Sequence, residues 1–200
     1  MDILVLASIF HVFLSACAAP SHDSSARGTT GELIQVLKNN TNLWLYKRTN
    51  GESGHKCLHW EKGNFDKVGT TYDFHEVYWS DGKRQRNPLK GEITSIPSGK
   101  NQGAALKVEG HSEGGDNVEY LLVNWNSTEQ CGIFYTEKLT EDGQNRETQT
   151  CGLYFGDKTV NNESLVKTCL AGYDHYCTEY KKGEQEQIIY TSDCQRLQGC

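Results

Sequence analysis

The sequence predicts an all-β protein, an eight-stranded up-and-down antiparallel β-barrel with a short N-terminal helix and a C-terminal helix. Eight short runs of alternating apolar and polar residues are separated by turn signals. The alternation stops in residues 162–177, where apolar residues recur at helical spacing. Cysteines in two late strands are matched by cysteines in this helix and in the tail, a pattern that predicts disulfides between barrel and helix. A β-sandwich would show a similar spacing of strands.

The chain is expected to begin with a secretory signal peptide, residues 1–19. Residues 3–14 are nearly all apolar, and Ala16-Cys17-Ala18 offers a cleavage site of small residues. The apolar run is shorter than the roughly 20 residues that a membrane-spanning helix needs. Leu14-Ser-Ala-Cys17 also fits a bacterial lipoprotein box, although no basic residue precedes it. We therefore expect a secreted, soluble protein.

Composition indicates a single domain over residues 32–200, preceded by a flexible arm at 20–31 that is rich in Ser, Gly and Thr. The 200 residues carry a net charge of −6, which becomes −5 without Asp2, the one charged residue of the signal peptide. This mild acidity argues against nucleic acid or an anionic membrane as a partner.

The first expected element is an amphipathic helix at Glu32–Lys38, because its apolar residues fall on one face. Pro88 interrupts the fourth predicted strand, which suits a barrel edge or a bulge. A last short strand, Gln187–Thr191, leads to Cys194. The eight barrel strands are predicted at Leu43–Thr49, His55–Glu61, Thr70–Trp79, Arg86–Ser95, Ala104–Glu109, Val118–Trp125, Gln130–Leu139 and Glu147–Phe155.

Eight cysteines are present, and seven remain without Cys17. Three disulfides would leave one thiol free or paired between two molecules, so we expect a monomer for which a disulfide-linked dimer is the alternative. Asn39, Asn126 and Asn162 each begin an Asn-x-Ser/Thr glycosylation site. All three fall in predicted loops or at the ends of elements, where glycans are accessible.

Five motifs stand in a characteristic order: His55-Lys-Cys57, Gln130-Cys-Gly-Ile-Phe-Tyr135, Cys151-Gly-Leu-Tyr154, Thr168-Cys169 through Tyr173 to Cys177, and Ile189-Tyr-Thr-Ser-Asp-Cys194. With these motifs the chain resembles the tick salivary lipocalins, the histamine-binding protein family, over nearly all of its mature length. The resemblance implies a lipocalin barrel that encloses a small ligand. The general Gly-x-Trp signature of lipocalins is not evident near the first strand.

The resemblance also implies a disulfide pattern. In the family the early cysteine bridges to the C-terminal one, which implies Cys57–Cys194 here. A strand cysteine bridges to the helix, which implies Cys131–Cys169. Cys151 would then pair with Cys177 or with Cys200.

The family's amine binders often carry an Asp and a Glu inside the barrel, and Gly132 and Gly152 stand at those positions in this chain. A buried ammonium needs a buried anion. Asp73, Glu76, Glu119 and Glu137 are the candidates to replace the missing acids. The two glycines would otherwise make the interior roomier and more apolar, which favours a lipid ligand. The residues predicted to line the barrel are Trp44, Trp60, Phe74, Glu76, Tyr120, Phe134 and Tyr154.

The sequence gives little support for catalysis. His55-x-Cys57-x-His59 could bind zinc, but Cys57 is expected in a disulfide, so no metal site is predicted. Neither a Gly-x-Ser-x-Gly motif nor a phosphate-binding or dinucleotide-binding loop is present. We expect no catalytic residue, no cofactor and no enzyme activity.

Three functions remain: a carrier that sequesters a small host mediator, a lipocalin that binds a host protein of complement or haemostasis, and an enzyme. The first is preferred. Histamine or another biogenic amine is the ligand that the resemblance implies, and a leukotriene or fatty acid is the alternative. Such a protein would act in tick saliva to blunt host inflammatory defence.

Overall fold

The structure is a computed structural model that describes residues 27–51, 54–96, 103–139, 146–181 and 186–198, with backbone alone for residues 139 and 146–149. The predicted signal peptide, most of the predicted arm and Cys200 lie outside these residues. In the described part of the chain, none of the helices is both long and apolar enough to cross a membrane.

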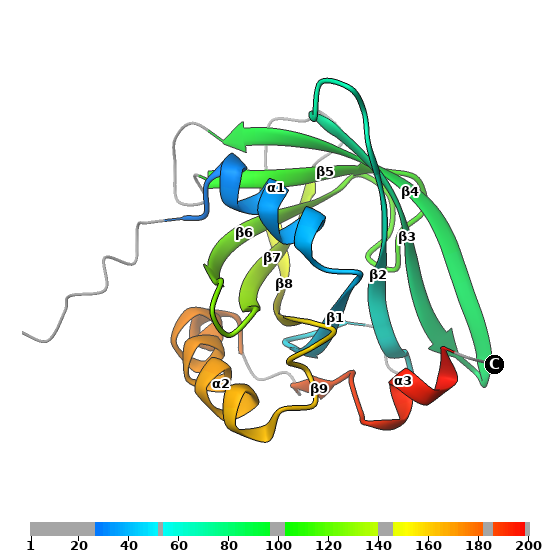
Figure 1. The fold of residues 1–200 in the computed structure, drawn as a ribbon, viewed down its shortest axis with the longest axis vertical. Helices are drawn as coiled ribbons and strands as arrows, with labels where there is room; N and C mark the ends of the chain where they lie inside the picture. The colour runs from blue at the N-terminus through cyan, green and yellow to red at the C-terminus, as the bar shows by residue number, and fades with distance from the viewer. Residues whose placement is uncertain (1–26, 52–53, 97–102, 140–145, 182–185, 199–200) are drawn as a thin grey trace, which may run out of the picture.

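One antiparallel sheet forms the body of the molecule (Figure 1). Its strand order is β2-β3-β4-β5-β6-β7-β8-β1-β9, and β1 also pairs with β2, which closes eight strands into a barrel. The predicted up-and-down barrel is confirmed, and a sandwich is excluded. The strands are β1 (Asn42–Arg48), β2 (Lys56–Phe65), β3 (Thr71–Ser80), β4 (Lys83–Ile96), β5 (Gly103–Glu109), β6 (Val118–Asn126), β7 (Cys131–Leu139), β8 (Arg146–Gly156) and β9 (Gln187–Ile188).

Pro88 lies in the part of β4 that pairs with β3 alone, because the ladder with β5 begins only at Lys90. The residue thus sits at a local edge of the barrel, where a missing N–H leaves no bond to β5 unmade. This agrees with the edge position predicted from the sequence.

Helix α1 (Thr30–Asn39) lies across one end of the barrel, where Leu33, Val36 and Leu37 join the interior core. The helix starts two residues before its predicted start because Thr29 and Glu32 form a capping box. The chain is already fixed at Gly28, whose N–H donates to Leu122 O at 3.0 Å and whose carbonyl accepts from Ala104 N at 2.9 Å. The folded part therefore extends into the segment predicted as an arm.

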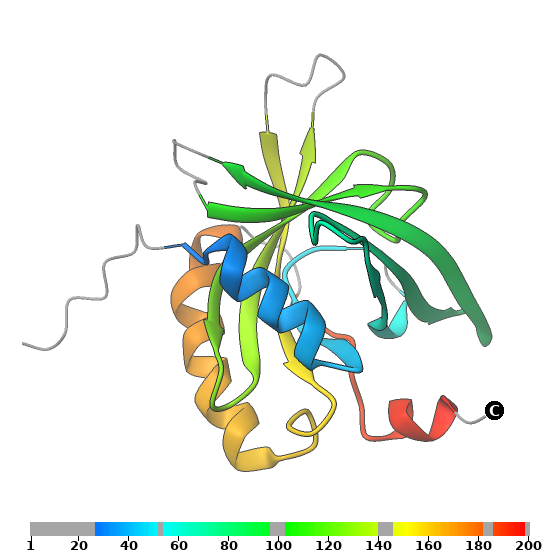
Figure 2. The ribbon, with the colours of Figure 1, turned by 45° about the horizontal axis from the view of Figure 1, so that its top comes forward.

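Two further helices cover the outside of the barrel (Figure 2). Helix α2 (Glu163–Cys177) matches the predicted C-terminal helix and packs on β7 and β8. A 3-10 turn, Thr178–Tyr180, follows it, and a short helix α3 (Asp193–Leu197) ends the described chain. The predicted last strand is shorter than expected, since β9 ends at Ile188.

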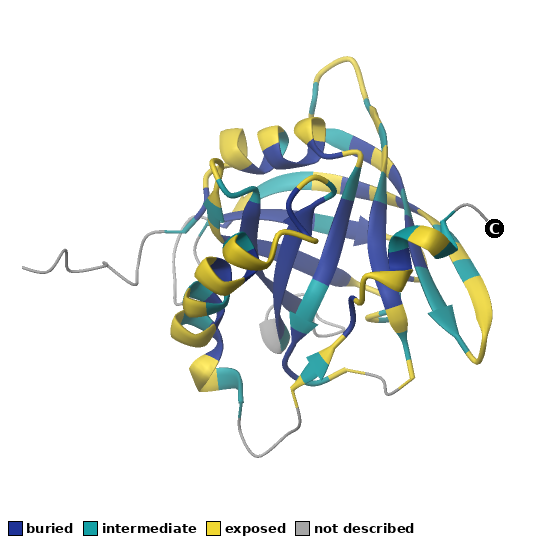
Figure 3. Cartoon of the chain, turned by 60° about the horizontal axis from the view of Figure 1, so that its bottom comes forward, coloured by how far each residue is buried: buried dark blue, intermediate teal, exposed yellow. Residues whose placement is uncertain are grey.

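Apolar residues form two separate cores, one inside the barrel and one outside it. The interior core includes Leu45, Trp60, Phe74, Tyr120 and Phe134. The outer core lies under α2 and the C-terminal segment, and its members include Trp44, Leu121, Ile133, Phe155 and Tyr173. Strands between the two cores are buried on both faces, as the dark blue strands in Figure 3 show.

Three disulfides tie the outer layer to the barrel, with Cα–Cα distances of 5.2 Å for Cys57–Cys194, 6.4 Å for Cys131–Cys169 and 5.5 Å for Cys151–Cys177. The first two are the pairs that the resemblance implies, and the third gives Cys151 the helix cysteine as its partner. Each bridge of this kind contributes about 2–4 kcal/mol to stability.

The three predicted glycosylation sites are exposed at Asn39, Asn126 and Asn162. Asn162 is also the N-cap of α2, since its side chain accepts from the backbone N–H groups of Ser164 and Leu165 at 3.1 and 3.3 Å. Glycosylation itself stays a prediction.

Candidate functional site

The interior of the barrel changes character along its axis. Near α1 it is filled by aromatic rings around Trp60, whose centroid lies 5.4 Å from that of Phe74, 5.8 Å from Phe134 and 4.6 Å from Tyr120. We call this half the closed end. Rings at these separations interdigitate as in a packed protein core.

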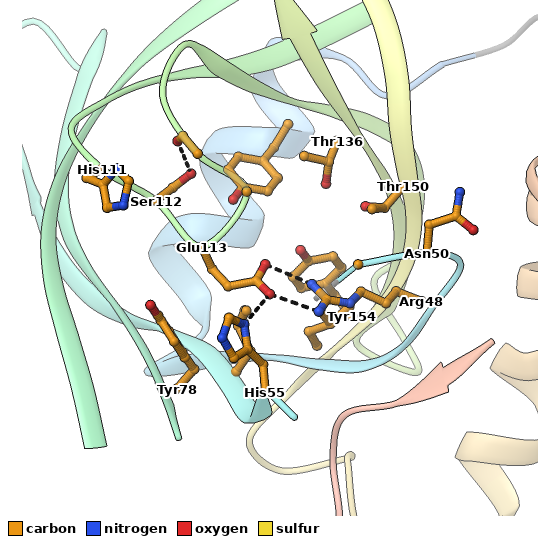
Figure 4. Close-up of a pocket in the computed structure, with 16 residues that line it drawn as sticks. Arg48, Asn50, His55, Tyr78, His111, Ser112, Glu113, Thr136, Thr150 and Tyr154 are labelled. Atoms are coloured by element: carbon orange, nitrogen blue, oxygen red, sulfur yellow. Dashed lines mark hydrogen bonds and ion pairs between the residues drawn. The ribbon is translucent and has the colours of Figure 1, made fainter. Parts of the chain in front are cut away.

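The other half, the open end, contains a cavity of about 530 Å³. Its walls come from β1, β2, β3, β6, β7 and β8 and from the loops that join β1 to β2 and β5 to β6. The lining is mostly polar, and Leu45 and Leu58 are its aliphatic members. Figure 4 shows the polar side chains that converge on the cavity.

A buried ion pair crosses the open end. The Arg48 guanidinium donates from both terminal nitrogens to the two carboxylate oxygens of Glu113, each at 2.8 Å. His55 Nδ1 lies 2.7 Å from Glu113 Oε1. The exposed fractions of these side chains are 4% for Arg48, 6% for Glu113 and 10% for His55. A two-pronged pair of this kind fixes both position and orientation.

A bulge in β1 turns Arg48 toward the interior. The register of β1 with β8 shifts between Leu45 and Lys47, so Tyr46 is an extra residue. Tyr46 and Lys47 therefore both face outward, where Lys47 pairs with Glu186 at 2.7 Å. Without the extra residue, Arg48 would point away from the cavity, because a shift of one residue reverses the faces of a strand.

The start of β2 is distorted as well. Its register with β3 shifts between Lys56 and His59, and Cys57 has a φ of 56°, in the left-handed region that non-glycine residues rarely adopt. The Cys57–Cys194 disulfide holds this conformation. His55, just before the distortion, lies in the cavity wall beside Tyr78, with the two rings 4.7 Å apart.

Glu113 reaches the cavity from the loop between β5 and β6. Ser112 and Gly115 exchange backbone hydrogen bonds of 3.2 and 2.9 Å, so the loop folds back on itself. Gly115 has a φ of 99°, which glycine adopts without strain. This tight turn directs Glu113 toward Arg48 and His55 (Figure 4).

Glu76 lies fully buried on the interior face of β3, behind the cavity wall, where it is bonded to the lining residues Glu113 and Tyr120. Its carboxylate accepts from the backbone N–H of Glu113 and from the Tyr120 hydroxyl at 3.2 Å. Burial is the main reason that the pKa of Glu76 is raised to about 7, and the nearby Glu113 carboxylate raises it further, while the hydrogen bond from the Glu113 N–H opposes the shift.

The pKa values of the ionisable groups around Glu76 are shifted in different directions. Burial disfavours ionisation of Glu113, but the hydrogen bond and charge of Arg48, and then those of His55, outweigh it, so the pKa of Glu113 is lowered. Burial raises the pKa of the Tyr120 and Tyr154 hydroxyls, which therefore stay protonated. The buried Nε1 of Trp60 makes no hydrogen bond of ordinary geometry, although its dipole is among the smaller influences that lower the pKa of Glu76.

Six of the seven residues predicted to line the barrel are inside it, but only two of them line the cavity. Tyr120 and Tyr154 line the cavity. Glu76 lies behind the cavity wall, bonded to Tyr120, whereas Trp60, Phe74 and Phe134 belong to the packed closed end.

Trp44 was predicted in the barrel lining, and the structure places it in the outer core instead. Its neighbours Leu43 and Leu45 both face inward, so Trp44 must face outward. There its Nε1 donates to Asp157 Oδ1 at 2.6 Å, and its ring stacks on His59 with the centroids 4.1 Å apart.

Of the candidate acids, Glu76 alone faces the interior. Asp73 is exposed. Glu119 and Glu137 are buried, but they stand opposite each other on the outer face of β6 and β7. Only one of the four therefore remains a candidate to replace the missing acids.

The two glycines do not enlarge the interior, contrary to the sequence-based expectation. A Cβ atom at position 132 would come within 2.3 Å of the Asn124 carbonyl oxygen and 2.5 Å of the Trp125 ring. At position 152 it would come within 2.9 Å of both Leu45 and Tyr154. Neighbouring groups have taken the space of the absent side chains, and the cavity that does exist is polar.

The sequence-based reasoning missed Arg48 and Glu113, and it considered His55 only as a metal ligand. Cys57 is in a disulfide, and His59 lies beneath Trp44, where burial lowers its pKa. Within the described residues, Glu129, Cys131 and Cys169 also gather their potential ligand atoms within 4.8 Å. Those two cysteines are bonded to each other and are not available to a metal.

The chain is similar to several solved structures of low sequence identity. The chain is similar to a crystal structure titled as the AM182 serotonin complex, with a TM-score of 0.49 and 12% identity over 81% of this chain and 91% of that one. Insecticyanin from the tobacco hornworm Manduca sexta gives a TM-score of 0.49 and 14% identity over 80% and 81%.

The siderocalin Ex-FABP gives a TM-score of 0.51 and 7% identity over 76% of this chain and 94% of that one, a likeness that concerns the lipocalin fold alone. No curated protein sequence matches the chain. The model of the tick histamine-binding protein family matches residues 21–196. The chain therefore belongs to the tick histamine-binding protein family.

Proposed function

We propose that this protein is secreted and sequesters histamine or another biogenic amine in the open-end cavity, removing a host mediator by stoichiometric binding. The family is one of ligand-binding proteins rather than enzymes, and sequestration requires affinity and abundance but no turnover. The cavity volume of about 530 Å³ lies within the range of small-molecule sites, roughly 300–1,000 Å³.

The observation that carries the proposal is the buried carboxyl group of Glu76. A carboxylate buried directly behind the cavity wall, as Glu76 is behind Tyr120 and Glu113, loses hydration, which is why its pKa is raised to about 7. A ligand ammonium would supply the missing positive charge and convert a costly buried anion into a compensated pair. The rings of Tyr78, Tyr120 and Tyr154 around the cavity offer further faces for a cation or an aromatic ring.

The lipid alternative has less support. A long acyl chain would need the volume that Trp60, Phe74 and Phe134 fill at the closed end. Polar side chains predominate in the remaining cavity. If neither amines nor lipids bind, the expected function is instead the binding of a host protein through the loops.

Calorimetric titration of the glycan-free, lipid-free protein with histamine, serotonin, leukotriene and arachidonate tests the proposal. We expect amine binding at pH 7.5 that Glu76→Gln weakens by about tenfold or more, since 1.4 kcal/mol corresponds to a factor of ten. Asp73→Asn, on the same strand but exposed, is the matched control and should bind as the wild type does. Unchanged amine affinity in Glu76→Gln would rule out the assigned counter-ion.

The pH dependence provides a second readout with serotonin, whose ammonium stays charged over the range. At pH 6 only about a tenth of the free protein has Glu76 ionised, given its pKa of about 7. Binding should therefore weaken as the pH falls below 7 and should release close to one proton per ligand at pH 6. Titrations in buffers of different ionisation enthalpy measure this release, which Glu76→Gln should abolish.

Secretion is tested on the expressed full chain. Mass spectrometry of the secreted protein should find the N-terminus at residue 19 or 20. It should also find glycans on Asn39, Asn126 and Asn162. Retention of residues 1–19 in the cell-associated protein would contradict this part of the proposal.

A further inference from the structure

We infer that Glu113 determines the charge of the ligand that the cavity accepts: by neutralising Arg48 and covering His55, it makes an amine site of a cavity that would otherwise bind a carboxylate. The inference rests on the proposed binding of an amine in the same cavity. It adds a selectivity residue, on a loop, to a site whose counter-ion is on a strand.

Arg48 is a permanent cation at a fixed place. Its guanidinium is always ionised at physiological pH, and the bulge in β1 commits it to the interior. Its Nε also donates to Gln187 Oε1 at 3.0 Å, from the segment that forms β9. The fork of donors is thus held by parts of the molecule other than the Glu113 loop. A carboxylate in the cavity would meet the Arg48 donors already in position.

Glu113 occupies that fork as a carboxylate of a ligand would. Both of its oxygens are used by Arg48 at 2.8 Å, and one is shared with His55 at 2.7 Å. The backbone N–H of the same residue donates to Glu76. One loop residue thereby pairs with Arg48 in the cavity wall and donates a hydrogen bond to the buried acid behind it.

The charges in the cavity explain the selectivity. With Glu113 in place, Arg48 is balanced and Glu76 is the carboxyl group left to pair with a ligand cation. If Glu113 is neutral, the Arg48 charge is no longer balanced by a loop carboxylate. Removing a carboxylate partner from a buried cation is costly, and a ligand carboxylate in its place relieves that cost while an ammonium increases it.

A different result is expected if Glu113 only holds the loop in place. Its replacement would then loosen the loop and weaken the binding of every ligand, whatever the ligand's charge. It would not create affinity for an anion. The gain of carboxylate binding is therefore the diagnostic readout.

The test uses two probes with the same ring and opposite charge, serotonin and 5-hydroxyindole-3-acetate, titrated into the full-length mature protein. The wild type should bind serotonin and reject the acid. Glu113→Gln should bind serotonin about tenfold or more weakly and bind the acid about tenfold or more tightly than the wild type does. The double variant Arg48→Gln/Glu113→Gln should lose the gained affinity for the acid.

Glu186→Gln is the matched control, because Glu186 pairs with Lys47 and Lys181 on the outside of the barrel at 2.7 and 3.0 Å. It should bind both probes as the wild type does. Thermal melting reports whether each variant is folded. If Glu113→Gln does not fold, the single variant Arg48→Gln decides: it should bind serotonin more tightly and still reject the acid, and unchanged serotonin affinity would overturn the inference.

A folded Glu113→Gln protein that keeps its serotonin affinity, or loses it without gaining the acid, overturns the inference. Failure of the proposed function is distinguishable, since the wild type would then bind neither probe. In that case Glu113→Gln still decides the inference: new affinity for the acid, lost again in the double variant, supports it, and silence refutes it.

Discussion

The two halves of the barrel interior share the same strands and differ in almost everything else. On β3, Phe74 packs against Trp60 at the closed end, while Glu76, two positions along the same face, is bonded to Tyr120 behind the cavity wall. The closed end buries apolar rings, which is how a small barrel obtains stability. The open end buries ionisable groups, which cost stability and are useful for recognition.

This contrast shows how a common scaffold accommodates different ligands. Inside the barrel, the aromatic packing is concentrated in the half that has no cavity, and the buried ion pair lies in the other half. A bulge and a loop bring Arg48 and Glu113 to the cavity, whereas Glu76 comes from a regular part of β3. Three experiments test how complete the division is.

The largest expected effect is on the closed end. Trp60→Ala removes the ring at the centre of the aromatic cluster and should lower the free energy of unfolding by about 3–5 kcal/mol. Tyr78→Ala, which truncates a half-buried side chain at the open end, should lower the free energy of unfolding by about 1 kcal/mol. Guanidinium denaturation with intact disulfides measures both. Equal losses would mean that stability is not concentrated at the closed end.

The second effect concerns buried charge at the open end. Because the folded protein holds the Glu76 proton up to a pKa of about 7, above its usual 4.5, it binds more protons than the unfolded chain between these values. Stability therefore falls as pH rises through this window, by about 3 kcal/mol, and stays lower above it. Glu76→Gln removes this component.

We therefore expect the ligand-free Glu76→Gln protein to gain stability relative to the wild type as pH rises from 4.5 to 7. A group with a lowered pKa away from Glu76, such as Glu61, contributes in the opposite sense to both proteins and cancels in the difference. Asp73→Asn is the control, for which no such slope should appear. A flat difference for Glu76→Gln would show that the open end accommodates this acid without cost.

The smallest effect concerns the helix that covers the closed end. Thr29→Ala removes the capping box of α1, in which Thr29 Oγ1 accepts from Glu32 N at 3.2 Å. It should cost about 1 kcal/mol, or roughly 2–4 °C in melting temperature for a chain of this size. Thr168→Ala, on the exposed face of α2 with its hydroxyl bonded to Ser164 O, should change little. Scanning calorimetry of both variants separates capping from the general effect of losing a threonine.

Local patterns in the sequence were sufficient for the fold. Each barrel strand was predicted within a few residues, because alternation and turn residues report on neighbours along the chain. The interior position of Trp60 and the exterior position of Trp44 could not be told apart in this way. Both faces of β1 are buried, one by the barrel interior and one by the outer core, so burial and hydrophobicity do not mark the interior face.

The candidate site was less predictable because distortions and a loop build it. The extra residue at Tyr46 that turns Arg48 inward leaves no mark in the sequence. Glu113 stands beside Gly114-Gly115, which indicates only a turn. Its role depends on contacts with residues 58 and 65 positions away in the chain. The sequence signal that could have found it is an acid in a glycine-rich loop at the barrel mouth, facing a strand that ends in arginine.

The disulfides give the mature protein a property suited to an environment rich in proteases. Cys131–Cys169 and Cys151–Cys177 join the middle and the C-terminal end of α2 to neighbouring strands, and Cys57–Cys194 joins the C-terminal segment to β2. A backbone cut anywhere between Cys177 and Cys194 would thus leave the severed piece covalently attached. Arg48 would keep its neighbour Gln187, and a nicked molecule could continue to hold its ligand. Durability after cleavage, rather than resistance to it, is what this arrangement provides.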